Sequence, residues 1–223
     1  MATAWTWTAF ASAWCPPFEP VPCDLFVTEA TFALPVFRHP PAAAEVERLL
    51  ASLRAFPERC HIVAAYSLGK AQRVLRQAGY DERVFVHGAI EKINAIYRAH
   101  GQDFGDTAPL VGTDGSTLAG RIALVPPGAR LDGLVRRVPE PLTAMASDWM
   151  RVRARARQRG VEFQLVISDH ADWPELIRTV EEMPGEVWIT HGREDALRRH
   201  LELRALGPDA VAQWLWPNFN STI

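Results

Sequence analysis

Three acid–base side chains each follow a short apolar run. His170 follows FQLVISD, His191 follows VWIT and Glu29 follows DLFVT. Imidazole and carboxylate groups can transfer protons near neutral pH, and both can bind a metal ion. An isolated histidine is more often structural, but placement at the end of successive apolar runs favours a functional site. These residue types would suit acid–base or metal-assisted hydrolysis.

Residues 165 to 190 have the pattern of a strand, a helix and a second strand. Asp172 is the expected N-cap of the helix rather than a catalyst, with Pro174 at the first helical position and Glu175 at the third. The expected apolar face of the helix consists of Leu176, Ile177, Val180 and Met183. A strand–helix–strand crossover leaves its strands parallel, often as neighbours. We therefore expect His170, His191 and Glu29 to meet at one sheet edge.

The remainder of the chain alternates strand and helix patterns. CHIVAAYS, RVFVHG and RIALVPPG have strand character, whereas EVERLLASLRAF, GKAQRVLRQAGY and IEKINAIYRAH have helix character. In the first helix the apolar residues Val46, Leu49, Leu50 and Leu53 share one face. GTDGSTLAG is expected to be a loop, and the prolines near residues 37 to 41 suggest a boundary. The order predicts an α/β fold.

Composition limits the classes of partner and compartment. The net charge of −2 gives no general attraction to nucleic acid, so an anion-binding surface must be local and built from arginine. Three cysteines, Cys15, Cys23 and Cys60, lack C-x-x-C spacing, which indicates a reducing compartment. No apolar run approaches the roughly 18 residues of a membrane span. We expect a cytoplasmic protein with no membrane partner.

Four motifs in order resemble one nuclease family. DLFVTEATF, YSLGKAQRVL, SDHADWPEL and WITHGRED resemble the β-CASP branch of the metallo-β-lactamase-fold nucleases, and in particular the bacterial ligase-associated DNA damage response exonucleases. The resemblance covers about residues 16 to 203. It implies a β-CASP domain at 38–150 and a partial metallo-β-lactamase (αββα) domain at 16–37 and 151–205. The end segments 1–15 and 206–223 match no part of the family.

The resemblance implies metal-dependent hydrolysis of DNA phosphodiesters by an exonuclease of DNA repair. Glu29 would be the acidic residue of the first motif, and His170 the proton donor to the leaving oxygen. Asp169 would orient His170 or bind backbone, and His191 would be a metal ligand. Family members hold two zinc ions, with manganese as the alternative metal. The implied partners are DNA, an ATP-dependent DNA ligase and a DEXH helicase.

The chain also departs from the family pattern. Family members carry an H-x-H-x-D-H metal motif, whereas no histidine precedes His39 here. We therefore expect most of the metal site to be missing and the chain alone to be inactive. Asp148 stands where the family has a turn glycine, which predicts a strained turn. The alternatives are a non-catalytic nucleic-acid- or partner-binding remnant, an RNA-processing β-CASP nuclease and, less favoured, a hydrolase of small molecules.

Two basic clusters are candidates for phosphate contacts. Arginines alternate at Arg151, Arg153, Arg155, Arg157 and Arg159, and Lys70 and Arg73 share a helix face. A solvated strand or loop would also explain the first cluster. The predicted nucleic-acid-binding residues are Lys70, Arg73, Arg151, Arg153 and Arg155.

Overall fold

The computed structural model describes residues 3–6, 19–78, 83–129, 131–138, 140–152, 157, 160–183 and 185–204. The chain forms two compact units, which are described separately below. Unit 1 comprises Met1–Arg38 and Asp169–Ile223, and unit 2 comprises His39–Ser168. The resemblance implied a central domain that ends at residue 150, whereas unit 2 continues to Ser168 because the strand that follows residue 160 joins its sheet.

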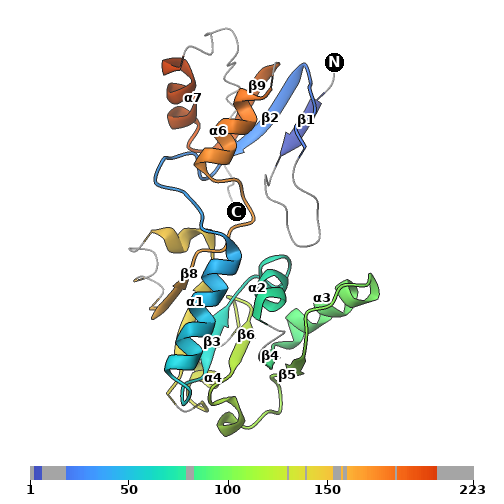
Figure 1. The fold of residues 1–223 in the computed structure, drawn as a ribbon, viewed down its shortest axis with the longest axis vertical. Helices are drawn as coiled ribbons and strands as arrows, with labels where there is room; N and C mark the ends of the chain where they lie inside the picture. Colours follow the sequence, from blue (N-terminus) through green and yellow to red (C-terminus); the bar gives the residue numbers. More distant parts are fainter. Residues whose placement is uncertain are drawn as a thin grey trace, which may run out of the picture. The chain divides into compact units, whose positions relative to one another are not determined.

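Unit 2 is built on a six-stranded parallel sheet with the order β5-β4-β6-β3-β7-β8 (Figure 1). The strands are β3 His61–Ala64, β4 Val84–Val86, β5 Thr107–Pro109, β6 Ile122–Val125, β7 Leu142–Ala146 and β8 Phe163–Leu165. Every residue of β3, β4 and β6 is buried, as expected for strands covered on both faces. The predicted α/β class is confirmed.

Helices connect the strands of unit 2. They are α1 Ala42–Ala55, α2 Lys70–Ala78, α3 Gly88–Ala99 and α4 Leu131–Val135, with short 3-10 helices η1 Gly115–Leu118 and η2 Asp148–Arg151. The predicted apolar face of α1 is confirmed, because all four of its expected residues are buried. The GTDGSTLAG segment, which was expected to be a loop, contains the short helix η1.

The beginning and the end of unit 2 are joined by one buried carboxylate. Glu45 lies in α1, and its Oε2 accepts the Val166 backbone N–H at 2.7 Å, directly after β8. Arg48, one turn along α1, donates to both carboxylate oxygens of Glu45 at 2.9 and 2.8 Å. These bonds satisfy a charged group that would otherwise be costly to bury.

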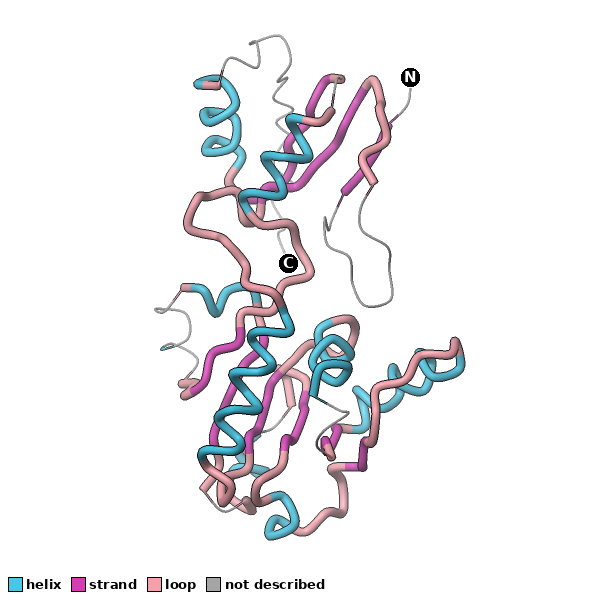
Figure 2. Tube along the Cα trace, viewed as in Figure 1, coloured by secondary structure: helices cyan, strands magenta, loops and turns pink. Residues whose placement is uncertain are grey.

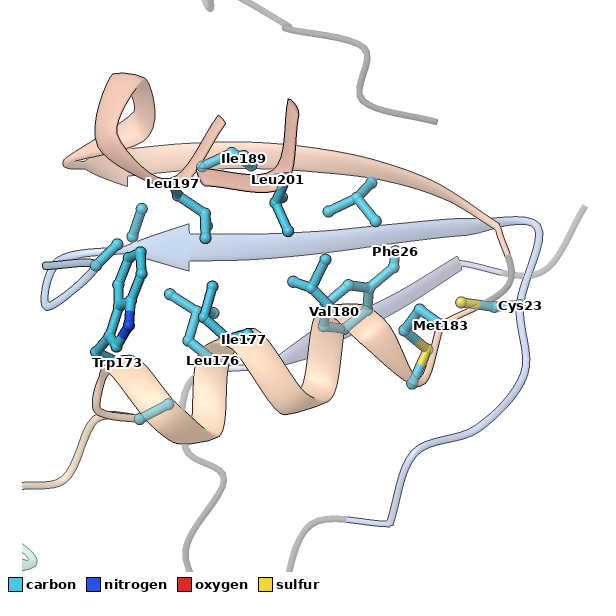
Figure 3. Packing of buried hydrophobic residues seen from close by; sticks show 14 residues of the cluster. Cys23, Phe26, Trp173, Leu176, Ile177, Val180, Met183, Ile189, Leu197 and Leu201 are labelled. Carbon is cyan, nitrogen blue, oxygen red and sulfur yellow. The ribbon is translucent and has the colours of Figure 1, made fainter. Parts of the chain in front are cut away.

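Unit 1 contains a three-stranded parallel sheet with the order β1-β2-β9. The elements are β1 Thr3–Thr6, β2 Leu25–Ala30, α6 Trp173–Glu181, β9 Glu186–Gly192 and α7 Glu194–Leu203. In Figure 3 the labelled apolar side chains of α6 lie on the side of the helix that faces β2, where Phe26 belongs to the same buried cluster. Leu176, Ile177 and Val180 are buried on this helix as predicted, whereas Met183 is buried just after the helix ends at Glu181.

The predicted strand–helix–strand crossover over residues 165–190 is wrong. β8 pairs with β7 in the sheet of unit 2, whereas β9 pairs with β2 in unit 1, so the two strands are not neighbours. Directly after β8, the backbone N–H of Val166 donates a hydrogen bond to Glu45. Residues 166–172 form a link without strand structure (Figure 2). The strand that pairs in parallel with β9 is therefore β2, not β8.

Among the helices in the described ranges, none is long and apolar enough to cross a lipid bilayer.

Candidate functional site

Glu29 and His170 are in direct contact in unit 1. The Nδ1 atom of His170 lies 3.0 Å from Oε1 of Glu29. Glu29 is the penultimate residue of β2, and His170 lies in the link before α6. The His170 side chain is 28% exposed and that of Glu29 is 13% exposed, so the pair is partly accessible to solvent.

The second carboxylate oxygen of Glu29 is also bound. Oε2 accepts the backbone N–H of Thr31 at 2.8 Å. Burial alone would raise the pKa of Glu29, but hydrogen bonds from His170 and Thr31 and the charge of His170 outweigh it and lower the pKa below its usual 4.5. Glu29 is therefore ionised at neutral pH and acts as an acceptor.

An ionised Glu29 determines which ring nitrogen of His170 carries a proton. Because Oε1 can only accept, Nδ1 of His170 must donate, and any proton exchanged with a substrate is the one on Nε2. A carboxylate at this distance also stabilises a protonated imidazole. The arrangement can thus hold a proton on the outer nitrogen and release it to a leaving group.

Aromatic contacts support the His170 ring. Phe32 is buried and meets the ring edge-on, with centroids 5.5 Å apart. Phe37 meets Phe32 in turn at 5.0 Å, and the Phe37 carbonyl accepts the backbone N–H of Trp173 at 3.0 Å. The segment after β2 therefore supports both His170 and the start of α6. Thr31 and Phe32 belong to the DLFVTEATF motif, but their residue types alone predict no role for them.

The capping box of α6 follows His170 by two residues. Asp172 is the N-cap, as predicted, and Oδ1 of its side chain accepts the Glu175 N–H at 3.2 Å, while Glu175 reaches back to the Asp172 N–H. Trp173 is the first helical residue, so Pro174 is at the second position rather than the first. Burial and the Asp172 charge raise the pKa of Glu175 to about 7.

β9 ends beside Glu29 in an irregular step. Glu29 pairs with Thr190, whereas the next residue of β2, Ala30, pairs with Gly192, which leaves His191 as the extra residue of a bulge. His191 is exposed and has a positive φ of 54°. Gly192 has φ 106°, and a Cβ there would lie 2.4 Å from the Ala30 carbonyl carbon. The close approach of the two backbones therefore requires glycine, a role that the sequence analysis did not assign.

The expected metal ligand lacks companions among the residues described. His191 lies near Glu29 in the strand register, but no group of three His, Cys, Asp or Glu residues in the described ranges could hold a metal ion. The described residues therefore do not fit the zinc or manganese centre that the resemblance implies. Asp169 is half-buried next to His170.

Two of the predicted nucleic-acid-binding residues are engaged inside unit 2. Lys70 is buried, and its Nζ lies 3.0 Å from Oδ2 of Asp148. This burial argues against a phosphate contact for Lys70. Arg73 is half-buried and its Nη1 donates to the Ser168 carbonyl. Both side chains tie α2 to later segments of the unit.

The turn at Asp148 is not strained. Asp148 begins η2, and among the described non-glycine residues only Glu140 and His191 have positive φ. The expectation of strain is wrong because Asp148 adopts a helical start and pairs with Lys70.

The arginine strip is described only in part. Arg151 is exposed at the end of η2, and Arg157 is also exposed. Arg153, Arg155 and Arg159 lie outside the described residues, so their predicted phosphate contacts remain predictions.

No family model matches the chain, but a known protein and solved structures are similar to it. A protein named "Probable DNA ligase" from Opitutus terrae is 29% identical over 202 residues, which are 83% of this chain and 19% of that protein. The chain thus spans about a fifth of that relative's length. A crystal structure of a protein of unknown function from Enterococcus faecalis V583 aligns with 87% of this chain and 50% of its own, at a TM-score of 0.47 and 13% identity.

Proposed function

We propose that the chain is a β-CASP nuclease of the metallo-β-lactamase fold that takes part in hydrolysis of DNA phosphodiesters, with exonuclease activity. Unit 2 would be the β-CASP domain, and unit 1 part of the metallo-β-lactamase domain. The observation that carries the proposal is the 3.0 Å contact between Nδ1 of His170 and the ionised carboxylate of Glu29.

In this proposal His170 donates a proton and Glu29 positions it. Phosphodiester cleavage leaves an alkoxide oxygen, which is a poor leaving group until it is protonated. Nε2 of His170 would supply that proton, while Glu29 holds Nδ1 and stabilises the protonated ring before transfer. The partial exposure of His170 supports access to a substrate oxygen.

The metal requirement of the family is not met by the described residues. Two zinc ions, or manganese, would activate the attacking water and bind the scissile phosphate. His191 without companion donors does not form such a centre, so no step is assigned to a metal here. We expect the 223-residue chain to show no metal-dependent cleavage by itself.

The DNA assignment draws support from the similarity to a protein named as a probable DNA ligase. In that protein a segment similar to this chain shares one polypeptide with much other sequence. An ATP-dependent DNA ligase and a DEXH helicase are the proposed partners, in the cytoplasm. RNA is the alternative substrate.

The test supplies an H-x-H-x-D-H motif and then removes the proposed proton donor. The H-x-H-x-D-H half of a related nuclease is fused in front of Pro16, and cleavage of labelled DNA and RNA oligonucleotides is measured with zinc or manganese. We expect DNA hydrolysis that falls at least about a hundredfold in His170→Asn. His100→Asn changes an exposed histidine at the end of α3 and is the matched control. Equal activity of the His170→Asn and control fusions would disprove the role of His170.

A non-catalytic binding function is the second candidate, favoured by the exposed side chains of Arg151 and Arg157. It predicts that the unfused chain binds single-stranded DNA with a steep salt dependence and without cleavage. Arg153→Ala with Arg155→Ala should then reduce the salt slope by about one unit per lost phosphate contact. If the unfused chain does not bind DNA and the fused protein is active, the binding function is disproved and the nuclease proposal stands.

A further inference from the structure

A cavity of about 470 Å³ opens in unit 2 at the carboxyl ends of three strands. It is lined by His87 directly after β4, by Leu110 directly after β5 and by Val125 at the end of β6. These residues belong to unit 2, whereas Glu29 and His170 belong to unit 1. The cavity is therefore a feature separate from the acid–base pair.

The cavity lies where the connections of the sheet change direction. β4 and β6 are neighbours, but β4 continues through α3 to β5 on one side, whereas β6 continues through α4 to β7 on the other (Figure 1). In open α/β sheets, diverging connections leave a crevice at the carboxyl ends of adjacent parallel strands, and ligands bind there. The position of the cavity is thus that of a ligand site in this class of fold.

Two polar side chains in the lining favour an anion. Nδ1 of His87 accepts the Ala89 backbone N–H at 3.1 Å, so the proton of the neutral ring is on Nε2, which is then a donor. Arg137 contributes a guanidinium, whose Nε donates to the Gly133 carbonyl at 3.2 Å. None of the described residues that line the cavity is acidic. The lining is complementary to negative charge.

The backbone that carries Arg137 is fixed by close packing. A Cβ at Gly115, the first residue of η1, would lie only 2.0 Å from the carbonyl oxygen of Arg137. This approach, together with the bond to Gly133, restrains the position from which the guanidinium extends. The site is therefore partly formed before any ligand binds.

The rest of the lining is apolar. Leu110, Val111, Val125 and Leu134 contribute hydrocarbon surface, and Val111 is 76% exposed. A single large exposed valine is unremarkable, but here it borders a cavity of the size that small-molecule sites have. An apolar wall beside a cation and a hydrogen-bond donor suits a ligand with a flat ring and one anionic group.

We propose that this cavity binds a small organic phosphate with a ring system, of the size of a nucleoside monophosphate. Arg137 and Nε2 of His87 would bind the phosphate, and the apolar wall would contact the ring. The proposal does not depend on the function proposed for the acid–base pair.

The test titrates the full chain with adenosine 5′-monophosphate, adenosine and inorganic phosphate by calorimetry. We expect the monophosphate to bind at least about tenfold more tightly than adenosine or phosphate alone, because only it uses both parts of the lining. Arg137→Gln should weaken its binding by about tenfold or more, because a charge-assisted contact is lost. Arg136→Gln, which changes the exposed neighbouring arginine outside the cavity, should leave binding unchanged.

Two further variants separate a lost site from a lost fold. His87→Asn keeps a good N-cap for α3 but removes the ring donor, and it should weaken binding. Gly133→Leu adds a side chain where a Cβ would meet no atom within 4 Å, so it should fill the cavity, keep the thermal midpoint and abolish binding.

Three outcomes would overturn the proposal. They are no binding of the monophosphate, equal affinity for adenosine, or unchanged affinity in both Arg137→Gln and a folded Gly133→Leu variant. His170→Asn should retain wild-type affinity, and loss of binding in that variant would assign the nucleotide to the acid–base site instead.

Discussion

Two pairs of a carboxylate and a basic side chain have the same separation but different surroundings in the two units. In unit 2, Nζ of Lys70 lies 3.0 Å from Asp148, and the two side chains are 5% and 8% exposed. In unit 1, Nδ1 of His170 lies 3.0 Å from Glu29, but the side chains are 28% and 13% exposed. Burial therefore separates a pair enclosed within unit 2 from a pair that is partly accessible to solvent.

The difference follows from what each pair connects. Lys70 begins α2 and Asp148 begins η2, and each follows a neighbouring strand of the central sheet, β3 and β7. Glu29 and His170 lie instead at the end of a strand and in a link without strand structure. A buried charge depends on its partner for stabilisation, whereas a partly exposed charge keeps part of its hydration.

The largest effect is expected from removing one member of the buried pair. Lys70→Met removes the cation that pairs with the buried Asp148, which should destabilise unit 2 by about 3–5 kcal/mol. Urea unfolding followed by hydrogen exchange would show the loss and locate it in unit 2. Lys92→Met changes the other lysine of the chain, which is exposed, and should shift stability by less than about 0.5 kcal/mol. Equal stability of the two variants would contradict the structural role of Lys70.

A change in the β-bulge beside Glu29 should give the second largest loss of stability. Gly192→Ala places a Cβ 2.4 Å from the Ala30 backbone at φ 106°, and we expect a loss on the order of 2–3 kcal/mol confined to unit 1. The His170 ring resonances should shift at the same time, because β2 and β9 would separate near Glu29. Gly101→Ala has a similar positive φ of 78° but meets no atom within 4 Å, so it should cost only about 1 kcal/mol.

A smaller effect, which is a gain in stability, is expected from a change at the N-terminal cap of α6. The pKa of Glu175 is raised to about 7, so the folded state retains a proton that the unfolded state releases near 4.5. Its contribution to stability is present below about pH 4.5 and is lost as the pH rises through about 7. Glu175→Gln keeps an acceptor for the Asp172 N–H without the charge. It should be more stable than wild type by on the order of 1 kcal/mol at about pH 8, allowing for solvent screening.

Thermal unfolding at about pH 4 and about pH 8 checks this expectation for Glu175. The two proteins should have nearly equal midpoints at the lower pH and diverge at the higher one. A difference that does not change with pH would mean that the charge of Glu175 is not the cause.

The accessible pair should have the smallest effect on stability. Glu29→Gln removes a charge from a partly hydrated pair, and we expect a loss of at most about 1 kcal/mol. Because the pKa of Glu29 is lowered from 4.5, its stabilisation is present above that value and is lost as the pH falls through the lowered pKa. The stability difference between variant and wild type should therefore shrink under acid. A loss in Glu29→Gln as large as that in Lys70→Met would remove the distinction between the two pairs.

Local patterns in the sequence predicted much of each unit. The buried face of α1, the capping box of α6 and the strands β2, β3, β4 and β6 follow from spacing and residue type within one element. β5 was not predicted, because Thr107–Pro109 is short, partly exposed and contains proline. Features within one helix or strand can thus be predicted where its residue pattern is long enough.

Contacts between distant segments were harder to predict. The sequence around Lys70 is compatible with a phosphate contact, and only the structure shows that Lys70 pairs with Asp148 instead. His170 does meet Glu29, but for a different reason from the one expected, because it reaches β2 from a link and not from a neighbouring strand. Strand partners and bulges depend on the whole sheet, which explains why the short β8 was placed beside the wrong strand.

The bond between Glu45 and Val166 has a consequence for the order of folding. β2 and β9 are neighbours in the sheet of unit 1, yet all of unit 2 lies between them in the chain. Pairing them across an unfolded segment of this length carries a large entropy of loop closure. Once unit 2 has folded, Glu45 holds Val166 beside α1, so the long loop is already closed when β9 is formed. Unit 2 should therefore fold first, and the contact between Glu29 and His170 should form late, limited by the rate at which unit 2 matures.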